Sequence, residues 1–455
     1  MLDRASNVDL LEQMEAEKYA AQLAILISSF ELTGEPVEVN FRELVPMHSG
    51  IDRATHLVHP YPAKLLPNIP LFFLNSGLAK RGSTVMDPFC GTGTVLLESL
   101  LSEKNCVGAD ANPLARLIAR TKTTAISTKR LAANYSRILS RVSGTPPIEF
   151  SPVVNVDHWF SRGTKVALAK LLGSIRKTRD AEIREFFEMC FSSAARRLSN
   201  ADPRLSVPVR LKTPLQKKPI QSAVKRVAVV FDKIVQTNIA RLDKLSVVGP
   251  SSCLAIFNDA RTICSDMNAQ ELTPVDLIIT SPPYVGAQKY IRASSLSIGW
   301  LGLAPDAKLR PLERLNIGRE HYPTSEYSKI CETIVPEAGP MLDAIRKEDP
   351  LRAHIASNYL VEMDVALRSA CAALKEGGHL VLVVGDNSIR GRAFKTTLYL
   401  RLLVERIGLK LRLELLDDIR SRGLMTKRNK TAGMIGREHI FLFQKTDCND
   451  QRRTR

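Results

Sequence analysis

The 455-residue sequence predicts an α/β fold: an open, mainly parallel, Rossmann-like sheet with a largely helical, basic insertion. Three observations predict it. Short apolar runs alternate with helical patterns, as expected for strands joined by crossover helices. Two of these runs end in turns rich in Gly or Pro, where sheets of this kind bind ligands. A hydrophobic content of 44% with 24% charged residues supplies a packed core and excludes a disordered chain.

The first half of the predicted sheet surrounds a glycine-containing turn. Residues 84–87 are predicted to form a buried strand, which leads through the turn at residues 88–93 into a helix at residues 94–101. Residues 106–110 form the next strand and end on a carboxylate. Another helix begins near Pro113, a residue type that is favoured in the first helical turn.

The second half of the sheet follows a long intervening segment. The remaining strands are predicted at residues 254–257, 276–280, 379–384, 410–416 and 439–443. A helix near residues 359–374 precedes the most apolar of these strands. Alternation of strands and helices on both sides of the long segment predicts one sheet built from both halves.

The net charge of +17 is unevenly distributed along the chain. Residues 1–50 hold nine acidic and three basic side chains, whereas residues 129–250 hold 23 Lys and Arg against nine Asp and Glu, a local charge of +14. A smaller stretch at residues 401–437 has a charge of +6. An isolated charge run is typical of a solvated helix face, but the local charge of +14 over residues 129–250 favours a surface that binds nucleic acid. Residues 202–219 are predicted to form a loop or linker.

The eight cysteines include no C-x-x-C pair, which disfavours a zinc site and a disulfide framework. The N-terminal region lacks the basic-then-apolar order of a signal peptide. Its longest apolar run, at residues 20–30, is too short to span a membrane. These features predict a protein of the reducing cytosol.

The turn that follows the first strand is the first chemical signal; it has the sequence Asp-Pro-Phe-Cys-Gly-Thr-Gly-Thr at residues 87–94. Gly91 and Gly93 let the backbone approach a ligand, and the following helix offers free N–H groups to an anionic part of it. Such glycines also occur in purely structural turns. No third Gly stands at the dinucleotide spacing and no Gly-Lys-Ser/Thr follows, which disfavours NAD and P-loop nucleotides. Asp110, at the end of the next strand, can accept hydrogen bonds from ribose hydroxyls.

The second signal is Ser281-Pro282-Pro283-Tyr284, directly after a predicted strand. Two prolines fix the backbone and remove two N–H donors, so carbonyl oxygens stay free beside a hydroxyl and an aromatic ring. This array suits a planar base with an exocyclic amine, because the oxygens accept the amine hydrogens while Tyr284 stacks on the ring. The alternative is a Pro-Pro turn with a packing tyrosine.

Both motifs, in this order, strongly resemble those of the S-adenosylmethionine-dependent DNA amino-methyltransferases. The serine resembles the cytosine-N4 branch, since adenine-N6 enzymes more often carry Asp or Asn in that place. The segment His-Pro-Tyr-Pro-Ala-Lys at residues 59–64 is similar to the one that closes over the methionine end of the cofactor. Asp259 resembles the residue that meets the adenine amino group. The resemblance covers residues 50–125 and 250–445.

The resemblance implies a class I methyltransferase sheet and direct transfer of an activated methyl group, with no metal and no covalent enzyme intermediate. The target base would leave the duplex, stack on Tyr284 and donate its amine hydrogens to Ser281 and to the Pro282 carbonyl. The chain contains no Pro-Cys dipeptide, which disfavours the cysteine nucleophile of cytosine-C5 methylation. The residues implied to be catalytic are Ser281, Pro282, Pro283 and Tyr284. Those implied to bind the cofactor are Lys64, Asp87, Phe89, Cys90, Gly91, Gly93, Thr94, Asp110 and Asp259, with Cys90 as a small packing residue of the loop.

The chain is thereby divided into a methyltransferase domain and added segments. The predicted segments are an acidic helical arm (1–50), a cofactor-binding half (51–128), a basic insertion (129–250), a catalytic half (251–284 and 356–447), an insertion after the catalytic loop (285–355) and a basic tail (448–455). The basic insertion is the first candidate for DNA recognition because its charge would hold phosphates. The insertion after the catalytic loop is the second, because it leaves the catalytic loop directly.

The predicted function is methylation of cytosine N4 at specific sites in double-stranded DNA, in the cytosol of a bacterium or archaeon. Methylation of adenine N6 in DNA is the nearest rival, and amino methylation of an RNA guanine is more distant. A non-catalytic DNA-binding protein on a methyltransferase scaffold is the alternative outside the enzymes, and the two intact motifs disfavour it. The resemblance also allows a cognate restriction endonuclease as a partner.

Overall fold

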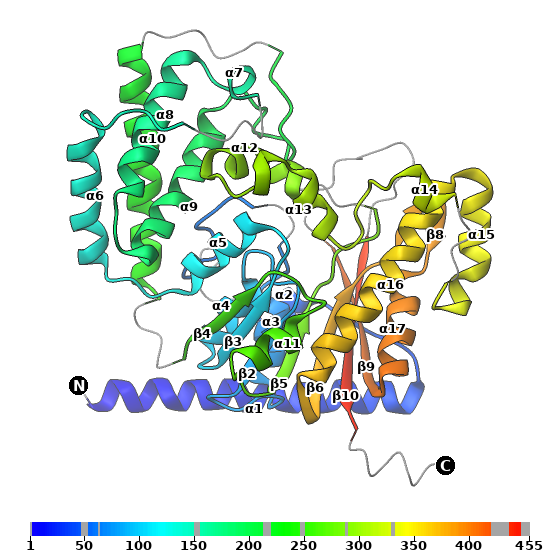
Figure 1. Cartoon of the computed structure of the whole chain (residues 1–455). Helices are drawn as coiled ribbons and strands as arrows, with labels where there is room; N and C mark the ends of the chain where they lie inside the picture. The colour runs from blue at the N-terminus through cyan, green and yellow to red at the C-terminus, as the bar shows by residue number, and fades with distance from the viewer. Residues whose placement is uncertain are drawn as a thin grey trace.

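The structure is a computed structural model that describes residues 2–46, 53–61, 64–149, 155–212, 220–245, 251–286, 290–328, 333–419 and 436–446 (Figure 1). Within these residues, eight strands form one sheet in the order β1-β9-β10-β6-β5-β2-β3-β4. They are β1 (Val37–Val39), β2 (Thr84–Asp87), β3 (Asn105–Ala109), β4 (Cys253–Phe257), β5 (Val275–Thr280), β6 (Leu374–Val384), β9 (Leu409–Asp418) and β10 (Arg437–Lys445). A separate pair consists of β7 (Asn387–Ile389) and β8 (Arg392–Phe394).

Neighbouring strands of the sheet run parallel, except that β10 is antiparallel to both β6 and β9. The predicted mainly parallel, Rossmann-like α/β fold is thus confirmed. Strand β2 has the predicted bounds, whereas β6 begins earlier than predicted, at Leu374. Strand β1 was not predicted, because three residues are too few to show the alternation that indicates a strand.

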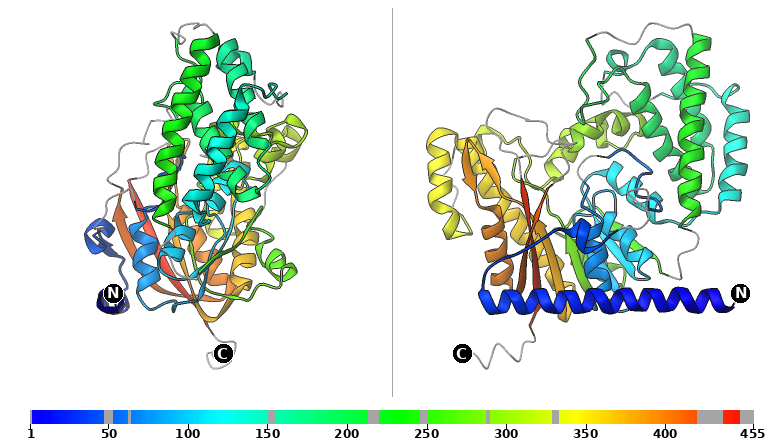
Figure 2. Two further views of the ribbon diagram at one scale, coloured as in Figure 1. Left: turned by 90° about the vertical axis from the view of Figure 1, so that its left-hand side faces the viewer. Right: turned by 180° about the vertical axis from the view of Figure 1, so that it is seen from behind.

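Helices cover both faces of the sheet (Figure 2). Leu277 and Ile279 of β5 pack into the core on one face, and Ile278 packs into the core on the other, as the two-residue period of a strand requires. The first face is covered by α1 (Leu2–Thr33), α2 (Phe41–Leu44), α3 (Asn68–Asn75) and α4 (Thr94–Leu101). The second is covered by α11 (Ile263–Ala269), α15 (Gly339–Glu348), α16 (Pro350–Ala372) and α17 (Thr396–Ile407).

Five helices of the basic insertion form a second body, which we call the helical lobe. They are α6 (Thr128–Val142), α7 (Val156–Trp159), α8 (Arg162–Arg176), α9 (Ala181–Leu198) and α10 (Ile220–Asp243). The lobe lies at the end of the molecule opposite α1 (Figures 1 and 2). It joins the sheet domain through α5 (Pro113–Thr123), whose Leu114, Leu117 and Ile118 enter the apolar core of the lobe. The predicted helical character of the insertion is therefore confirmed.

The two segments considered for DNA recognition meet in this lobe. After the catalytic loop the chain forms α12 (Tyr290–Leu301), α13 (Arg310–Leu315) and α14 (Thr324–Tyr327). Trp300 of α12 is buried with its ring 5.4 Å from that of Phe160 and 5.7 Å from that of Phe191, measured between centroids. Residues from both segments thus share one apolar core beside the sheet.

Some predictions differ from the structure or lie outside the described residues. The helix predicted at residues 359–374 begins earlier, at Pro350, because Asp349 caps it by accepting a hydrogen bond from the Arg352 amide at 3.1 Å. The last predicted residue of that helix, Leu374, instead begins β6. The basic tail at 448–455, much of the basic stretch at 401–437 and the end of the predicted linker at 202–219 lie outside the described residues.

Candidate active site

A cavity of about 210 Å³ lies at the carboxyl ends of β2, β3, β4 and β5. Both chemical motifs of the sequence line it, which agrees with the general position of ligand sites in open α/β sheets. Of the predicted site residues, Lys64, Asp87, Phe89, Cys90, Gly91, Thr94, Asp110, Asp259, Ser281, Pro282, Pro283 and Tyr284 line the cavity. Gly93 is the one predicted site residue that does not.

The glycine turn has the geometry that its two glycines allow. Gly91 has φ +50° and Gly93 has φ +73°, a backbone region that residues with a Cβ rarely adopt. Gly93 caps α4, and a Cβ added there would lie 3.2 Å from Cβ of Ala119. Gly93 therefore serves the close packing of α4 against α5, whereas Gly91 faces the cavity.

Two carboxyl groups, the buried one of Asp87 and the half-buried one of Asp110, fix the turn to its neighbours. Asp110 accepts hydrogen bonds from the backbone amides of Gly91 at 3.0 Å and Asn112 at 2.7 Å. Asp87 accepts one from the Phe89 amide at 3.1 Å and one from the Thr280 hydroxyl at 2.7 Å. Burial raises the pKa of Asp110 and raises that of Asp87 to about 7. Because Thr280 directly precedes Ser281, the bond to Asp87 ties the two motifs together.

Cys90 is buried within the turn, and burial raises the pKa of its thiol well above the usual range. The thiol therefore stays protonated and is a poor nucleophile. Its Sγ lies in the small apolar cluster beneath the turn with Leu96, Cys106 and Ala119. This placement supports the interpretation of Cys90 as a packing residue.

Lys64 reaches the cavity from the segment before β2. Its Nζ donates hydrogen bonds to the backbone carbonyls of His56 at 2.9 Å and His59 at 3.1 Å, and burial lowers its pKa to about 8. Two residues of the same segment, Pro62 and Ala63, lie outside the described residues. The lysine thus holds this segment in a tight turn beside the glycine loop.

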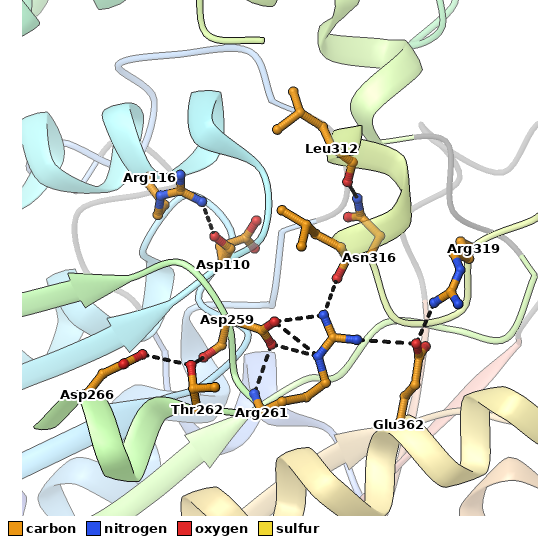
Figure 3. A network of polar contacts seen from close by, with 11 residues as sticks. Asp110, Arg116, Asp259, Arg261, Thr262, Asp266, Leu312, Asn316, Arg319 and Glu362 are labelled. Carbon is orange, nitrogen blue, oxygen red and sulfur yellow. Dashed lines mark hydrogen bonds and ion pairs between the residues drawn. The ribbon is translucent and has the colours of Figure 1, made fainter. Parts of the chain in front are cut away.

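Asp259 follows β4 and belongs to a network of charged side chains (Figure 3). Both oxygens of its carboxylate accept hydrogen bonds from the Arg261 guanidinium, at 2.7 to 3.0 Å. Arg261 also donates to Glu362 of α16 at 3.2 Å, and Glu362 pairs in turn with Arg319. Asp259 is therefore oriented by charged neighbours before any ligand arrives.

The Ser281–Tyr284 loop meets a residue that the sequence reasoning missed. The Tyr284 hydroxyl is hydrogen-bonded to the carboxyl group of Glu438, which is the second residue of β10 and also lines the cavity. Burial, reinforced by the nearby Asp417, raises the pKa of Glu438 to about 7. Burial likewise raises the pKa of Tyr284, so its hydroxyl stays protonated and donates. An acid immediately before the predicted last strand at 439–443 was the only signal for Glu438.

Tyr61, Tyr290 and Asn316 are among the other lining residues that were not predicted as site residues. The rings of Tyr61 and Tyr290 are stacked with centroids 6.3 Å apart. Asn112 donates hydrogen bonds to the Tyr61 hydroxyl at 2.9 Å and to Ser294 of α12 at 3.1 Å. Tyr61 stands in the segment before Lys64, so its motif was a usable signal, whereas Tyr290 and Asn316 reach the cavity only through the tertiary fold.

Parts of this sequence are similar to known proteins. The model of the RMKL-like methyltransferase domain matches residues 57–137, which include the glycine turn and Asp110. The Type II methyltransferase M.MvaI of Kocuria varians is 24% identical over 76% of this chain and 79% of its own length. The Type II methyltransferase M.MjaII of Methanocaldococcus jannaschii is 33% identical over 24% of this chain and 20% of its own length.

Among solved structures, the rRNA methyltransferase aviRa of Streptomyces viridochromogenes has a TM-score of 0.34 and 12% identity, covering 89% of this chain and 96% of that protein. The sequence matches support a methyltransferase with S-adenosylmethionine as its cofactor, as predicted. Within the described ranges, no cluster of three or more His, Cys, Asp or Glu side chains is arranged to hold a metal ion. In the same part of the chain, no helix combines the length and apolar character needed to cross a membrane.

Proposed function

We propose that the protein methylates the exocyclic N4 amine of cytosine in double-stranded DNA, with S-adenosylmethionine as the methyl donor. One observation carries the proposal: the glycine turn and the Ser281–Tyr284 loop line the same cavity, joined by the Asp87–Thr280 hydrogen bond. A donor held by the first loop and an amine held by the second would therefore lie within reach of each other. Such proximity is a large part of the catalysis that methyl transfer requires.

The cofactor half of the cavity offers groups suited to each part of S-adenosylmethionine. Each oxygen of Asp110 accepts one backbone amide, which leaves further lone pairs for the ribose hydroxyls. Lys64 and the first-turn amides of α4, where Gly93 supplies no side-chain cap, suit the carboxylate of the methionine end. Asp259 is the proposed partner of the adenine amine. Because both carboxylate oxygens of Asp259 already accept hydrogen bonds from Arg261, the adenine amine either binds to the same oxygens beside Arg261 or replaces one of the Arg261 hydrogen bonds.

The catalytic half suits an aromatic amine. The Ser281 hydroxyl and the Pro282 carbonyl accept the two amine hydrogens, which draws the nitrogen toward tetrahedral geometry and exposes its lone pair. The ring of Tyr284 stacks on the base, and the hydrogen bond to Glu438 fixes the orientation of that ring. The nitrogen attacks the methyl carbon, the carbon–sulfur bond breaks, and the nitrogen then loses a proton.

The charge of the helical lobe supports DNA as the substrate. The lobe comes from the segment with a local charge of +14, and its apolar core includes residues of α12, whose Tyr290 lines the cavity, so phosphates bound on the lobe would bring a duplex to the site. The two Type II methyltransferase relatives also support the choice of DNA. Serine at position 281 favours cytosine over adenine, and a cognate restriction endonuclease remains a predicted partner.

The test is a competition between substrates. Purified protein is incubated with labelled S-adenosylmethionine and equal masses of duplex DNA and structured RNA, and the products are digested to nucleosides. We expect label in N4-methylcytosine from DNA. Label only in N6-methyladenine would overturn the choice of base, and label only in RNA would overturn the choice of polymer.

A further inference from the structure

A second cavity, of about 270 Å³, opens beside the candidate active site. The two cavities share Tyr290 and Asn316 in their walls, so they are adjacent. The second cavity is built from α12, α13 and the loop that follows α13. It lies in the segment 285–355, the second candidate for DNA recognition, and no predicted catalytic or cofactor-binding residue lines it.

Three exposed arginines line this cavity without an ion-pair partner among the described residues: Arg292, Arg310 and Arg314. Arg310 and Arg314 stand four residues apart on α13, so they project from one face of the helix. Arg292 lies in the first turn of α12 and lines the same cavity. Three guanidinium groups gathered around one hollow, with no ion-pair partner in the described part of the chain, are an arrangement that an anionic ligand would stabilise.

The remaining charges of the cavity are largely neutralised. Arg319 pairs with Glu362, and its guanidinium lies 4.3 Å from the ring centroid of Tyr322. Glu320 pairs with Arg352 at 3.7 Å. Of the described acidic residues in this wall, Glu313 alone then faces the three unpaired arginines, and the cavity keeps a net positive charge.

The charged network fixes this cavity relative to the active site (Figure 3). From Asp259 in the first cavity it runs through Arg261 and Glu362 to Arg319 in the second. Arg261 also donates to the carbonyl of Leu315 at 3.1 Å, where α13 ends. The helix that carries Arg310 and Arg314 is thus anchored to the cofactor side of the site.

We propose that the second cavity binds backbone phosphates of the DNA strand that carries the target nucleotide. This inference rests on the proposed DNA methyltransferase function. A nucleotide extruded into the first cavity stays joined to its strand, so its neighbouring phosphates must pass close to the first cavity. Guanidinium groups bind phosphate oxygens with paired hydrogen bonds, which suits Arg292, Arg310 and Arg314. Binding there would hold the strand in the extruded geometry.

The test compares the double variant Arg292→Gln/Arg314→Gln with wild type and with Arg368→Gln, an exposed arginine on α16 remote from both cavities. The logarithm of DNA affinity is measured against the logarithm of salt concentration. Removing one side chain that neutralises a phosphate reduces the magnitude of this slope by about 0.9. The slope of the double variant should therefore be smaller in magnitude than that of wild type by about 2, and the control should keep the wild-type slope. Affinity for S-adenosylmethionine, measured by calorimetry, should stay unchanged in both, which shows that the fold is intact.

A second measurement locates the phosphates that the cavity binds. Duplexes carry one uncharged methylphosphonate at successive positions around the target base. We expect wild type to lose affinity at one or two positions beside that base, and the double variant to be insensitive at those same positions. An unchanged salt slope, an unchanged methylphosphonate profile, or an altered sequence preference without a change in slope would each overturn the inference. Failure of the wild type to methylate any DNA would instead contradict the proposed function, and the wild-type reaction alone reveals it.

Discussion

Replacing Glu438 by glutamine should stabilise the protein at alkaline pH. Burial, with a smaller contribution from Asp417, raises the pKa of this carboxyl group to about 7 from an ordinary value of 4.5. Between these pH values the folded protein holds a proton that the unfolded chain releases. The contribution of the protonated Glu438 to the free energy of unfolding is therefore fully present below about pH 4.5 and is lost as the pH rises through 7.

The size of the effect follows from the two pKa values. A shift from 4.5 to about 7 corresponds to roughly 3 kcal/mol of lost stability above pH 7. Glutamine carries no charge and keeps an oxygen that accepts the Tyr284 hydroxyl hydrogen. The free energy of unfolding of Glu438→Gln should thus exceed that of wild type by roughly 1–3 kcal/mol near pH 8.5 and match it near pH 4.

Denaturant unfolding at both pH values measures this difference. Glu405→Gln serves as the control, because it removes an exposed acid from α17 without entering the cavity. We expect the control to show no such pH-dependent gain. If the free energies of unfolding of Glu438→Gln and wild type differ equally at both pH values, or at neither, then Glu438 is not a partner of Tyr284 whose pKa is raised by burial.

Three further substitutions test separate parts of the site. Tyr284→Ala should weaken DNA binding, measured by gel shift, by about 10- to 100-fold, because one base loses its stacking partner. Its S-adenosylmethionine affinity, measured by calorimetry, should stay nearly unchanged, and an equal loss of both affinities would contradict the role of Tyr284. Asp110→Ala should lower S-adenosylmethionine affinity at least about tenfold while DNA affinity persists. Gly93→Ala should cost about 1–2 kcal/mol of folding stability, because its φ is +73° and Ala119 lies against it. An unchanged denaturation midpoint would contradict that packing role.

The sequence predicted the parts of the site that local chemistry determines. The turn at residues 88–93 and the loop Ser281–Tyr284 follow apolar strands directly, and the carboxyl ends of neighbouring parallel strands meet at one edge of a sheet. Twelve of the thirteen predicted site residues line the cavity for this reason. Gly93 does not, because a glycine can serve close helix packing as well as ligand approach, and sequence spacing alone does not separate the two.

The rest of the site depends on contacts between distant segments. Glu438 reaches Tyr284 only because β10 inserts antiparallel between β6 and β9, a pairing that no local pattern specifies. Tyr290 and Asn316 line the cavity because α12 and α13 pack into the helical lobe through Trp300 and Leu312. Sequence reasoning treated the segments 129–250 and 285–355 as separate candidates, whereas their shared core was visible only in three dimensions.

Base-resolution mapping of methylation in the DNA of an expression host tests the central claim most directly. The claim is that one cavity brings S-adenosylmethionine and an extruded cytosine together. Wild type should deposit N4-methylcytosine at one recurrent sequence, and Tyr284→Ala should deposit far less at that same sequence. Host DNA that carries only N6-methyladenine, or no new methylated base with soluble and folded protein, would contradict the account.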